Sequence, residues 1–201
     1  MPTVSAVRLS FSNMKKTVGI IVSLFLLILP VQLTAIEFTA KQQRALFLYS
    51  FAKYINWSVF VDQHSIIIGI SDDDELYREL NKICTDKSVA GKKLKVTKVN
   101  GVDAADCQIL FLPDLTSDNS RALIEYTRHL QVLVVTTGQD RAALSGDIII
   151  TSSKSSPRKT EFHINGENIR KKRMKISADL IELMKGQPGY HFHEISTVHK
   201  R

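Results

Sequence analysis

The sequence predicts a single α/β domain built in three layers, with helices on both faces of a largely parallel sheet. Two observations favour this fold: short runs of branched apolar residues alternate with segments of helical periodicity, and the runs are continuous enough for strands buried on both faces. Crossover connections between parallel strands place the intervening helices on the sheet faces. An N-terminal amphipathic helix precedes the first strand, and a C-terminal antiparallel hairpin is expected at the end of the sheet.

The first element is a helix over residues 41–56. Its large apolar side chains recur on one helical face, as in a helix that covers a core; they are Phe47, Leu48, Phe51, Ala52, Tyr54 and Ile55. Runs of Ile, Leu and Val predict four buried strands, at 65–71, 107–112, 131–136 and 147–151. Two alternating segments predict half-exposed strands, an edge strand at 93–99 and the hairpin partner of the last buried strand at 158–165.

Helices are expected between these strands. Four consecutive acids, Asp72 to Glu75, favour a helix N-terminus and predict a helix over 74–85, because acidic groups interact well with that end of the helix dipole. Further helical segments are expected over 117–129, as a short turn near 139–143, and as a last helix that starts at 166 or 175 and ends at Lys185.

Residues 1–35 have the organisation of a secretory signal peptide. Lys15 and Lys16 precede an apolar run of about a dozen residues, which is shorter than the roughly 20 residues that span a bilayer. We expect cleavage after Ala35, with Met14 as an alternative start and an uncleaved anchor as the competing interpretation. The remaining chain is then an exported domain over 36–185 without stable membrane insertion, followed by a polar, flexible tail over 186–201.

The charge of the chain gives no case for nucleic-acid binding. The net charge of +7 arises from 27 basic and 20 acidic residues. Three of the basic residues lie before residue 36, where there are no acids, so the rest of the chain carries 24 basic against 20 acidic residues. A net charge of +4 spread over this length is ordinary.

The two cysteines lie in the exported part of the chain, where thiols oxidise. Cys84 ends a predicted helix and Cys107 begins a predicted strand, which places both near the starting edge of the parallel strands. We therefore expect a disulfide between them, with two buried free thiols as the alternative. On the chain-entropy description, such a bridge contributes about 3–4 kcal/mol to stability.

The sequence contains no Ser/His/Asp order, P-loop, Gly-rich dinucleotide turn or HExxH motif, so no catalytic residue, metal ligand or cofactor is expected. Asp72, Asp114 and Thr136 follow or end three predicted strands, and strand ends of this kind line the ligand crevice of α/β sheets. They are the candidate residues of an alternative function, the binding of a small periplasmic ligand. A helix N-cap also accounts for the acids without any ligand.

Two surface features suggest contact with partners. Leu46, Tyr49, Lys53 and Trp57 lie opposite the core stripe of the first helix, and apolar side chains rimmed by charge often mark interaction surfaces. Alternatively, other segments cover them, or Trp57 folds back into the core. The basic run over 170–173 could meet an anionic lipid or an acidic partner, or it forms a solvated helix face.

Several of these segments together resemble one protein family. The segments are Leu48–Trp57 (LYSFAKYINW), Cys107–Leu112 (CQILFL), Gly146–Ile149 (GDII), Phe162–Asn165 (FHIN) and Ile176–Ile181 (ISADLI). They are similar to the YfiR family, and the resemblance covers about residues 41–184. Its most specific part is the Phe-Ala-Lys-Tyr segment that ends at Trp57.

The resemblance implies a function. Family members are small periplasmic α/β proteins that bind the periplasmic region of an inner-membrane diguanylate cyclase and hold it inactive, so loss of repression raises cyclic di-GMP and biofilm formation. Redox-sensitive disulfides and dimerisation are also implied. We therefore expect a regulatory binding protein without catalysis, whose partner is such a cyclase or a related sensor kinase and which can form a homodimer.

Overall fold

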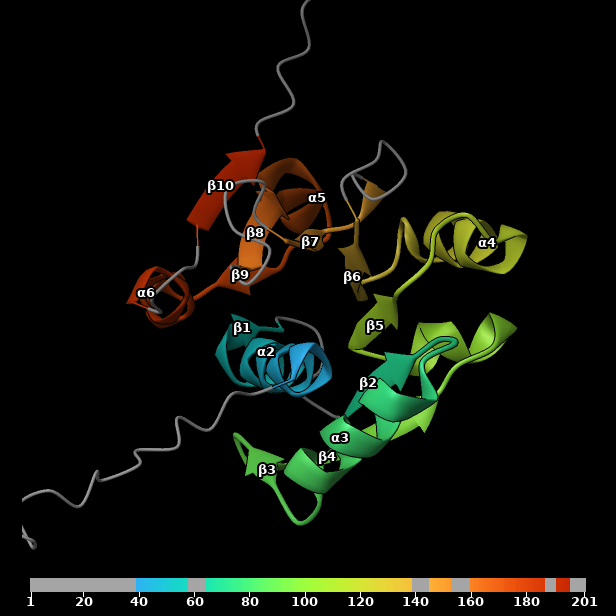
Figure 1. Ribbon diagram of the computed structural model, residues 1–201, viewed down its shortest axis with the longest axis horizontal. Coiled ribbons are helices and arrows are strands. Elements are labelled where there is room, and N and C mark those ends of the chain that lie inside the picture. The colour runs from blue at the N-terminus through green and yellow to red at the C-terminus, as the bar shows by residue number, and fades with distance from the viewer. Residues whose placement is uncertain (1–38, 58–63, 139–144, 153–159, 187–190, 196–201) are drawn as a thin grey trace, which may run out of the picture. The chain divides into compact units, whose positions relative to one another are not determined.

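The computed structural model describes residues 39–57, 64–138, 145–152, 160–186 and 191–195. These residues form an eight-stranded sheet with helices on both faces (Figure 1). In chain order its strands are β2 (Ser65–Ile70), β3 (Ser88–Val89), β4 (Lys92–Lys98), β5 (Ile109–Leu112), β6 (Leu133–Thr137), β7 (Ile148–Ser152), β8 (Thr160–Asn165) and β10 (His191–Ile195). The spatial order is β10-β8-β7-β6-β5-β2-β4-β3.

The sheet is largely parallel, as the sequence predicted. Strands β4, β2, β5, β6 and β7 all run in the same direction. The predicted hairpin is confirmed as the antiparallel pair β7–β8, in which Ile150 pairs with Phe162. The residues that connect the two strands, 153–159, lie outside the described ranges. At the far edge, the two-residue strand β3 pairs antiparallel with β4.

The α-helices begin beside polar side chains that cap them, whereas the 3₁₀ helix has no side-chain cap. They are α2 (Ala40–Tyr54), α3 (Asp74–Cys84), the 3₁₀ helix η1 (Gly101–Asp106), α4 (Asp118–Thr127), α5 (Gly166–Lys171) and α6 (Ala178–Gly186). Thr39 and Gln42 form a reciprocal capping box at the start of α2. Asp73 caps α3 by accepting a hydrogen bond from the Leu76 N–H, so the acidic run is confirmed as a helix start.

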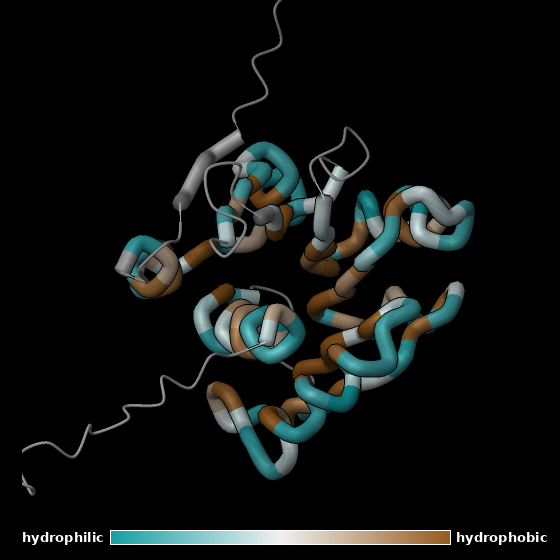
Figure 2. The backbone as a smooth tube through the Cα atoms, in the orientation of Figure 1, coloured by the Kyte–Doolittle hydropathy of each residue, from teal (hydrophilic) through white to brown (hydrophobic). Residues whose placement is uncertain are grey.

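Two hydrophobic clusters fill the spaces between the layers. The first lies between the sheet and helices α2, α3 and α6, and includes Phe51, Phe111 and Phe162. The second lies on the other face, against α4 and η1, and includes Leu112 and Val134. Figure 1 shows α2 and α6 on one side of the sheet and α4 on the other, and in Figure 2 hydrophobic segments follow β5 and β6. The core stripe of the first helix is confirmed.

The C-terminal part differs from expectation in two ways. Of the two expected starts of the last helix, the later one lies close to the start of α6, and the earlier one belongs to a separate helix, α5. Arg173 adopts a left-handed conformation (φ 56°) that ends α5, and the Met174 N–H donates to the Ile169 carbonyl. A short strand, β9 (Lys175–Ile176), separates the two helices and pairs antiparallel with β1 (Ile55–Asn56). The expected flexible tail includes β10, which pairs in parallel with β8 and therefore belongs to the sheet.

Two expectations fall outside the described residues. These are the signal peptide over 1–35 and the helical turn near 139–143. Within the described ranges, no helix has both the length and the apolar character required to cross a membrane.

Candidate functional site

The four residues proposed to contact a partner all lie on or just after α2. We call Leu46, Tyr49, Lys53 and Trp57 the α2 surface. Lys53 is exposed and Leu46 is 38% exposed, so these two side chains do face away from the core. Tyr49 and Trp57 are half-buried and pack against the first hydrophobic cluster. Half of the α2 surface is therefore partly buried against the core, whereas the sequence pattern places all four side chains opposite the core stripe.

A groove lies at the C-terminal end of α2. It has a volume of about 560 Å³, and Lys53 and Trp57 both line it together with residues of β1, β3 and the start of α6. Leu46 and Tyr49 lie further back along the helix and do not line it. The structure thus brings two of the four predicted residues together in a concave site and places the other two beside it.

Backbone pairing fixes the position of this groove. Ile55 pairs with Ile176 between β1 and β9, and the Ser177 N–H donates to the Tyr54 carbonyl at 3.1 Å. The Lys53 ammonium lies 4.9 Å from the centre of the Tyr54 ring, a distance that allows cation–π attraction. Its interaction with Tyr54 raises the pKa of Lys53, so this cation stays charged at neutral pH.

The residues of the alternative ligand site lie at the ends of neighbouring strands, but their polar groups are engaged locally. Asp72 is exposed and accepts a hydrogen bond from the Ser71 hydroxyl at 2.9 Å. Asp114 accepts from the Thr116 N–H and hydroxyl, and these hydrogen bonds lower its pKa. Thr136 is buried and contacts Gly146, where a Cβ would lie 2.6 Å from the Thr136 hydroxyl oxygen. The two carboxylates therefore stabilise their own loops and Thr136 packs against Gly146, and the three side chains do not form one ligand-binding site.

The expected disulfide is absent, because the two cysteines lie on opposite faces of the sheet. Both are buried free thiols. Cys84 belongs to the first hydrophobic cluster, whereas Cys107 belongs to the second and contacts Gly69, where a Cβ would lie 2.7 Å from the Cys107 sulfur. Two residues near the same edge of a sheet can lie on opposite faces of it, and the positions of Cys84 and Cys107 in the sequence do not determine which face each side chain occupies.

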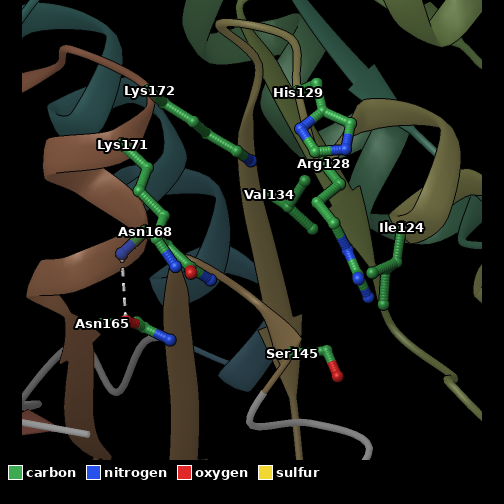
Figure 3. Close-up of a pocket in the computed structure, with 9 residues that line it drawn as sticks. All are labelled: Ile124, Arg128, His129, Val134, Ser145, Asn165, Asn168, Lys171 and Lys172. Carbon is green, nitrogen blue, oxygen red and sulfur yellow. Dashed lines mark hydrogen bonds between the residues drawn. The ribbon is translucent and has the colours of Figure 1, made fainter.

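A second cavity lies between α4 and α5, and little in the local sequence pattern indicates it. Its volume is about 580 Å³, and we call it the basic cleft (Figure 3). The lining residues come from the end of α4, from β6, from the segment just before β7, from the end of β8 and from α5: Ile124, Arg128, His129, Val134, Ser145, Asn165, Asn168, Lys171 and Lys172. The basic run over 170–173 was the only local signal, and it does not reveal the α4 side of the cleft.

A buried ion pair forms one side of the basic cleft. The Lys172 ammonium donates to Asp147 Oδ2 at 2.7 Å and to the Val132 carbonyl at 2.9 Å, and the same carboxylate oxygen accepts from the Val134 N–H. Burial raises the pKa of Asp147, although Lys172 acts in the opposite direction. The interpretation of 170–173 as a wholly solvated helix face is therefore wrong at Lys172, which is only 7% exposed.

The described residues include no cluster of three or more His, Cys, Asp or Glu side chains arranged to hold a metal ion. Both cavities are surface clefts, one lined in part by an aromatic and a lysine side chain and the other mainly by basic and amide side chains. These features define the class of protein: a three-layer α/β domain whose most distinctive surface features are clefts suited to binding.

Comparison with known proteins identifies the family within this class. The family model described as YfiR/HmsC-like matches residues 41–185, and the chain belongs to this family. The family consists of periplasmic proteins that are regulatory rather than catalytic. A search of curated proteins finds no match.

Among solved structures, a 3-hydroxyacyl-CoA dehydrogenase of Archaeoglobus fulgidus matches with 10% sequence identity and a TM-score of 0.28. The match covers 68% of this chain and 50% of the dehydrogenase, so the chain corresponds to half of that protein's length.

Proposed function

We propose that this protein represses a membrane-bound diguanylate cyclase, or a related sensor kinase, by binding its periplasmic region. The observation that carries the proposal is the family match, which spans nearly the whole domain from residue 41 to residue 185. An export signal over residues 1–35, cleaved after Ala35, would deliver the domain to the compartment where that region is accessible.

The α2 surface is the proposed contact. Trp57 and Lys53 line a groove, and the Leu46 side chain is exposed further back on α2, so an aromatic anchor, a cation and an aliphatic group lie on or just after one helix. Hot spots at protein interfaces are rich in aromatic residues set in pockets, and a charge at the rim favours a partner of opposite sign. An acidic or hydroxyl-bearing segment of the receptor with an apolar side chain would fit this arrangement.

The proposed mechanism is a shift in population. A receptor that exchanges between active and inactive conformations becomes inactive when a partner binds the inactive one more tightly. To move such an equilibrium from mostly active to mostly inactive, the partner needs a preference of several kcal/mol for the inactive conformation. No reaction at this protein is required, so repression depends on its periplasmic concentration and on its affinity.

The test is to change the α2 surface and measure binding to the purified periplasmic region of a membrane-bound diguanylate cyclase from the same organism. Lys53→Glu reverses a charge on an exposed side chain, so affinity should fall by about 2 kcal/mol while the melting temperature stays the same. Trp57→Ala should weaken binding similarly and also lower the melting temperature, because Trp57 packs against the core. In cells, Lys53→Glu should raise cyclic di-GMP at a normal periplasmic protein level.

Lys87→Glu is the matched control. Lys87 is an exposed lysine in the turn after α3 and lies outside the groove, so the same charge change there should leave affinity and repression unchanged. If Lys53→Glu and Trp57→Ala both bind the receptor as tightly as the natural protein, the α2 surface is not the contact. If the natural protein does not bind the receptor at all, the proposed function itself is wrong.

A further inference from the structure

The basic cleft has a lining that suits an anion. Its walls carry Arg128 and His129 from the end of α4 on one side, and Lys171 and Lys172 from α5 on the other (Figure 3). Two amide side chains, a serine hydroxyl and two aliphatic side chains are the other described residues that line it, and none of the described lining residues carries a carboxylate. The two basic walls are separated by about 40 residues in the sequence, so only the fold brings them together.

Two of these cations are available to a ligand. Arg128 forms an ion pair with Glu125 on its own helix, and Lys171 forms one with Glu167 at 2.6 Å. Both pairs are exposed to solvent, and neither carboxylate lines the cleft. Exposed pairs of this kind contribute about 0–1 kcal/mol, so an anion bound in the cleft can replace them at little cost.

The third cation, Lys172, has a positioning role. Its ammonium joins α5 to β6 and β7 through the Val132 carbonyl and the Asp147 carboxylate. The pairing gives the buried Asp147 carboxylate a counter-charge and holds α5 at a fixed position relative to the sheet. The wall that carries Lys171 is therefore preorganised, which reduces the free energy needed to order the site on binding.

We propose that the basic cleft binds a small organic anion that carries phosphate or carboxylate groups. The planar guanidinium of Arg128 can donate two parallel hydrogen bonds to either group, and Lys171 can approach the same group from the opposite wall. The Asn168 amide can donate to an adjacent oxygen. A volume of about 580 Å³ lies in the range of small-molecule sites. This site is separate from the α2 surface, and the proposal does not depend on the proposed function.

The experiment titrates pyrophosphate and citrate into the purified, exported form of the chain by calorimetry at constant ionic strength. Two probes are used because they distinguish a phosphate-bearing from a carboxylate-bearing ligand. Arg128→Gln and Lys171→Gln are the test variants. The matched controls are Arg121→Gln, whose side chain pairs with Asp118 on the same helix, and Lys82→Gln, whose side chain pairs with Glu79. Each control removes the same charge and a similar surface ion pair away from the cleft.

We expect at least one probe to bind saturably, and each test variant to weaken binding about tenfold, which is about 1.4 kcal/mol, while the controls bind normally. Equal weakening by Arg121→Gln would show a general charge effect and would overturn the proposal, as would the absence of saturable binding by both probes. A parallel measurement uses vesicles that contain phosphatidylglycerol. Binding to these vesicles without binding of either probe would assign the basic residues to a membrane surface and would also overturn the proposal.

Discussion

Each of the two thiols lies in an environment that suppresses ionisation. Burial raises the pKa of Cys84 to about 11. Burial also raises the pKa of Cys107, to about 12, and the nearby acids Asp106 and Asp103 act in the same direction. Since the thiolate is the reactive form of cysteine, both residues should be chemically inert in the folded protein.

We predict that iodoacetamide labels neither cysteine in the native protein at neutral pH and labels both after unfolding in urea without reductant. The physical reason is the combination of burial and raised pKa at both sites. Intact mass after labelling gives the number of modified thiols directly. A denatured, unreduced protein that gains no label would show that the two cysteines are joined after all.

At the scale of elements, the sequence predicts those helices and strands whose burial follows a regular local pattern. The run of isoleucines at β2 and the stripe of α2 are strong signals because burial on a strand or on a helix face repeats along the chain. Strands β1, β3 and β9 have two residues each, too few to show a periodic pattern, and β1 and β9 exist only because they pair with each other across about 120 residues of sequence.

The candidate sites were predictable only in part, for the same reason. Lys53 lies in the last turn of α2 and Trp57 follows four residues later, after strand β1, so closeness in the sequence alone indicates that they are neighbours. The basic cleft instead depends on how α4 and α5 are placed against the sheet. The partner of Lys172, Asp147, lies 25 residues earlier in the chain, and nothing in the local pattern of 170–173 indicates which of its basic residues is buried.

The ion pair between Asp147 and Lys172, with the hydrogen bond from Lys172 to the Val132 carbonyl, connects three elements, so its loss should be costly. Asp147→Asn leaves the ammonium of Lys172 buried without a counter-charge, so the free energy of unfolding should fall by about 3–5 kcal/mol. Lys172→Met should be similarly costly because it leaves a buried carboxylate. The double variant should lose much less than the sum of the two, since it buries no unpaired charge. Urea denaturation of all four proteins measures the coupling; strictly additive losses would show that the pair acts as two independent groups.

At the scale of the whole molecule, a hydrophobic cluster on each face stabilises the sheet. The two edges of the sheet are covered by different elements. The β4 edge is covered by the short strand β3 and carries Lys93, Lys95 and Lys98, and lysines on an edge discourage pairing with another chain. The opposite edge ends in β10, which covers β8. Without β10, the N–H and C=O groups along β8 would be unpaired on that side.

This arrangement predicts the effect of shortening the chain. A variant that ends at Gly186 lacks β10, so the free energy of unfolding should fall by about 1–3 kcal/mol through the loss of the five paired positions from His191 to Ile195. Because β8 then becomes an exposed edge strand, the variant should also associate at high concentration. The control removes only residues 196–201 and should match the full exported chain in both properties. Urea denaturation and light scattering on the three proteins measure the two effects. A chain ending at Gly186 that is as stable and as monomeric as the control would show that residues 191–195 contribute nothing to the sheet, as expected of a flexible tail.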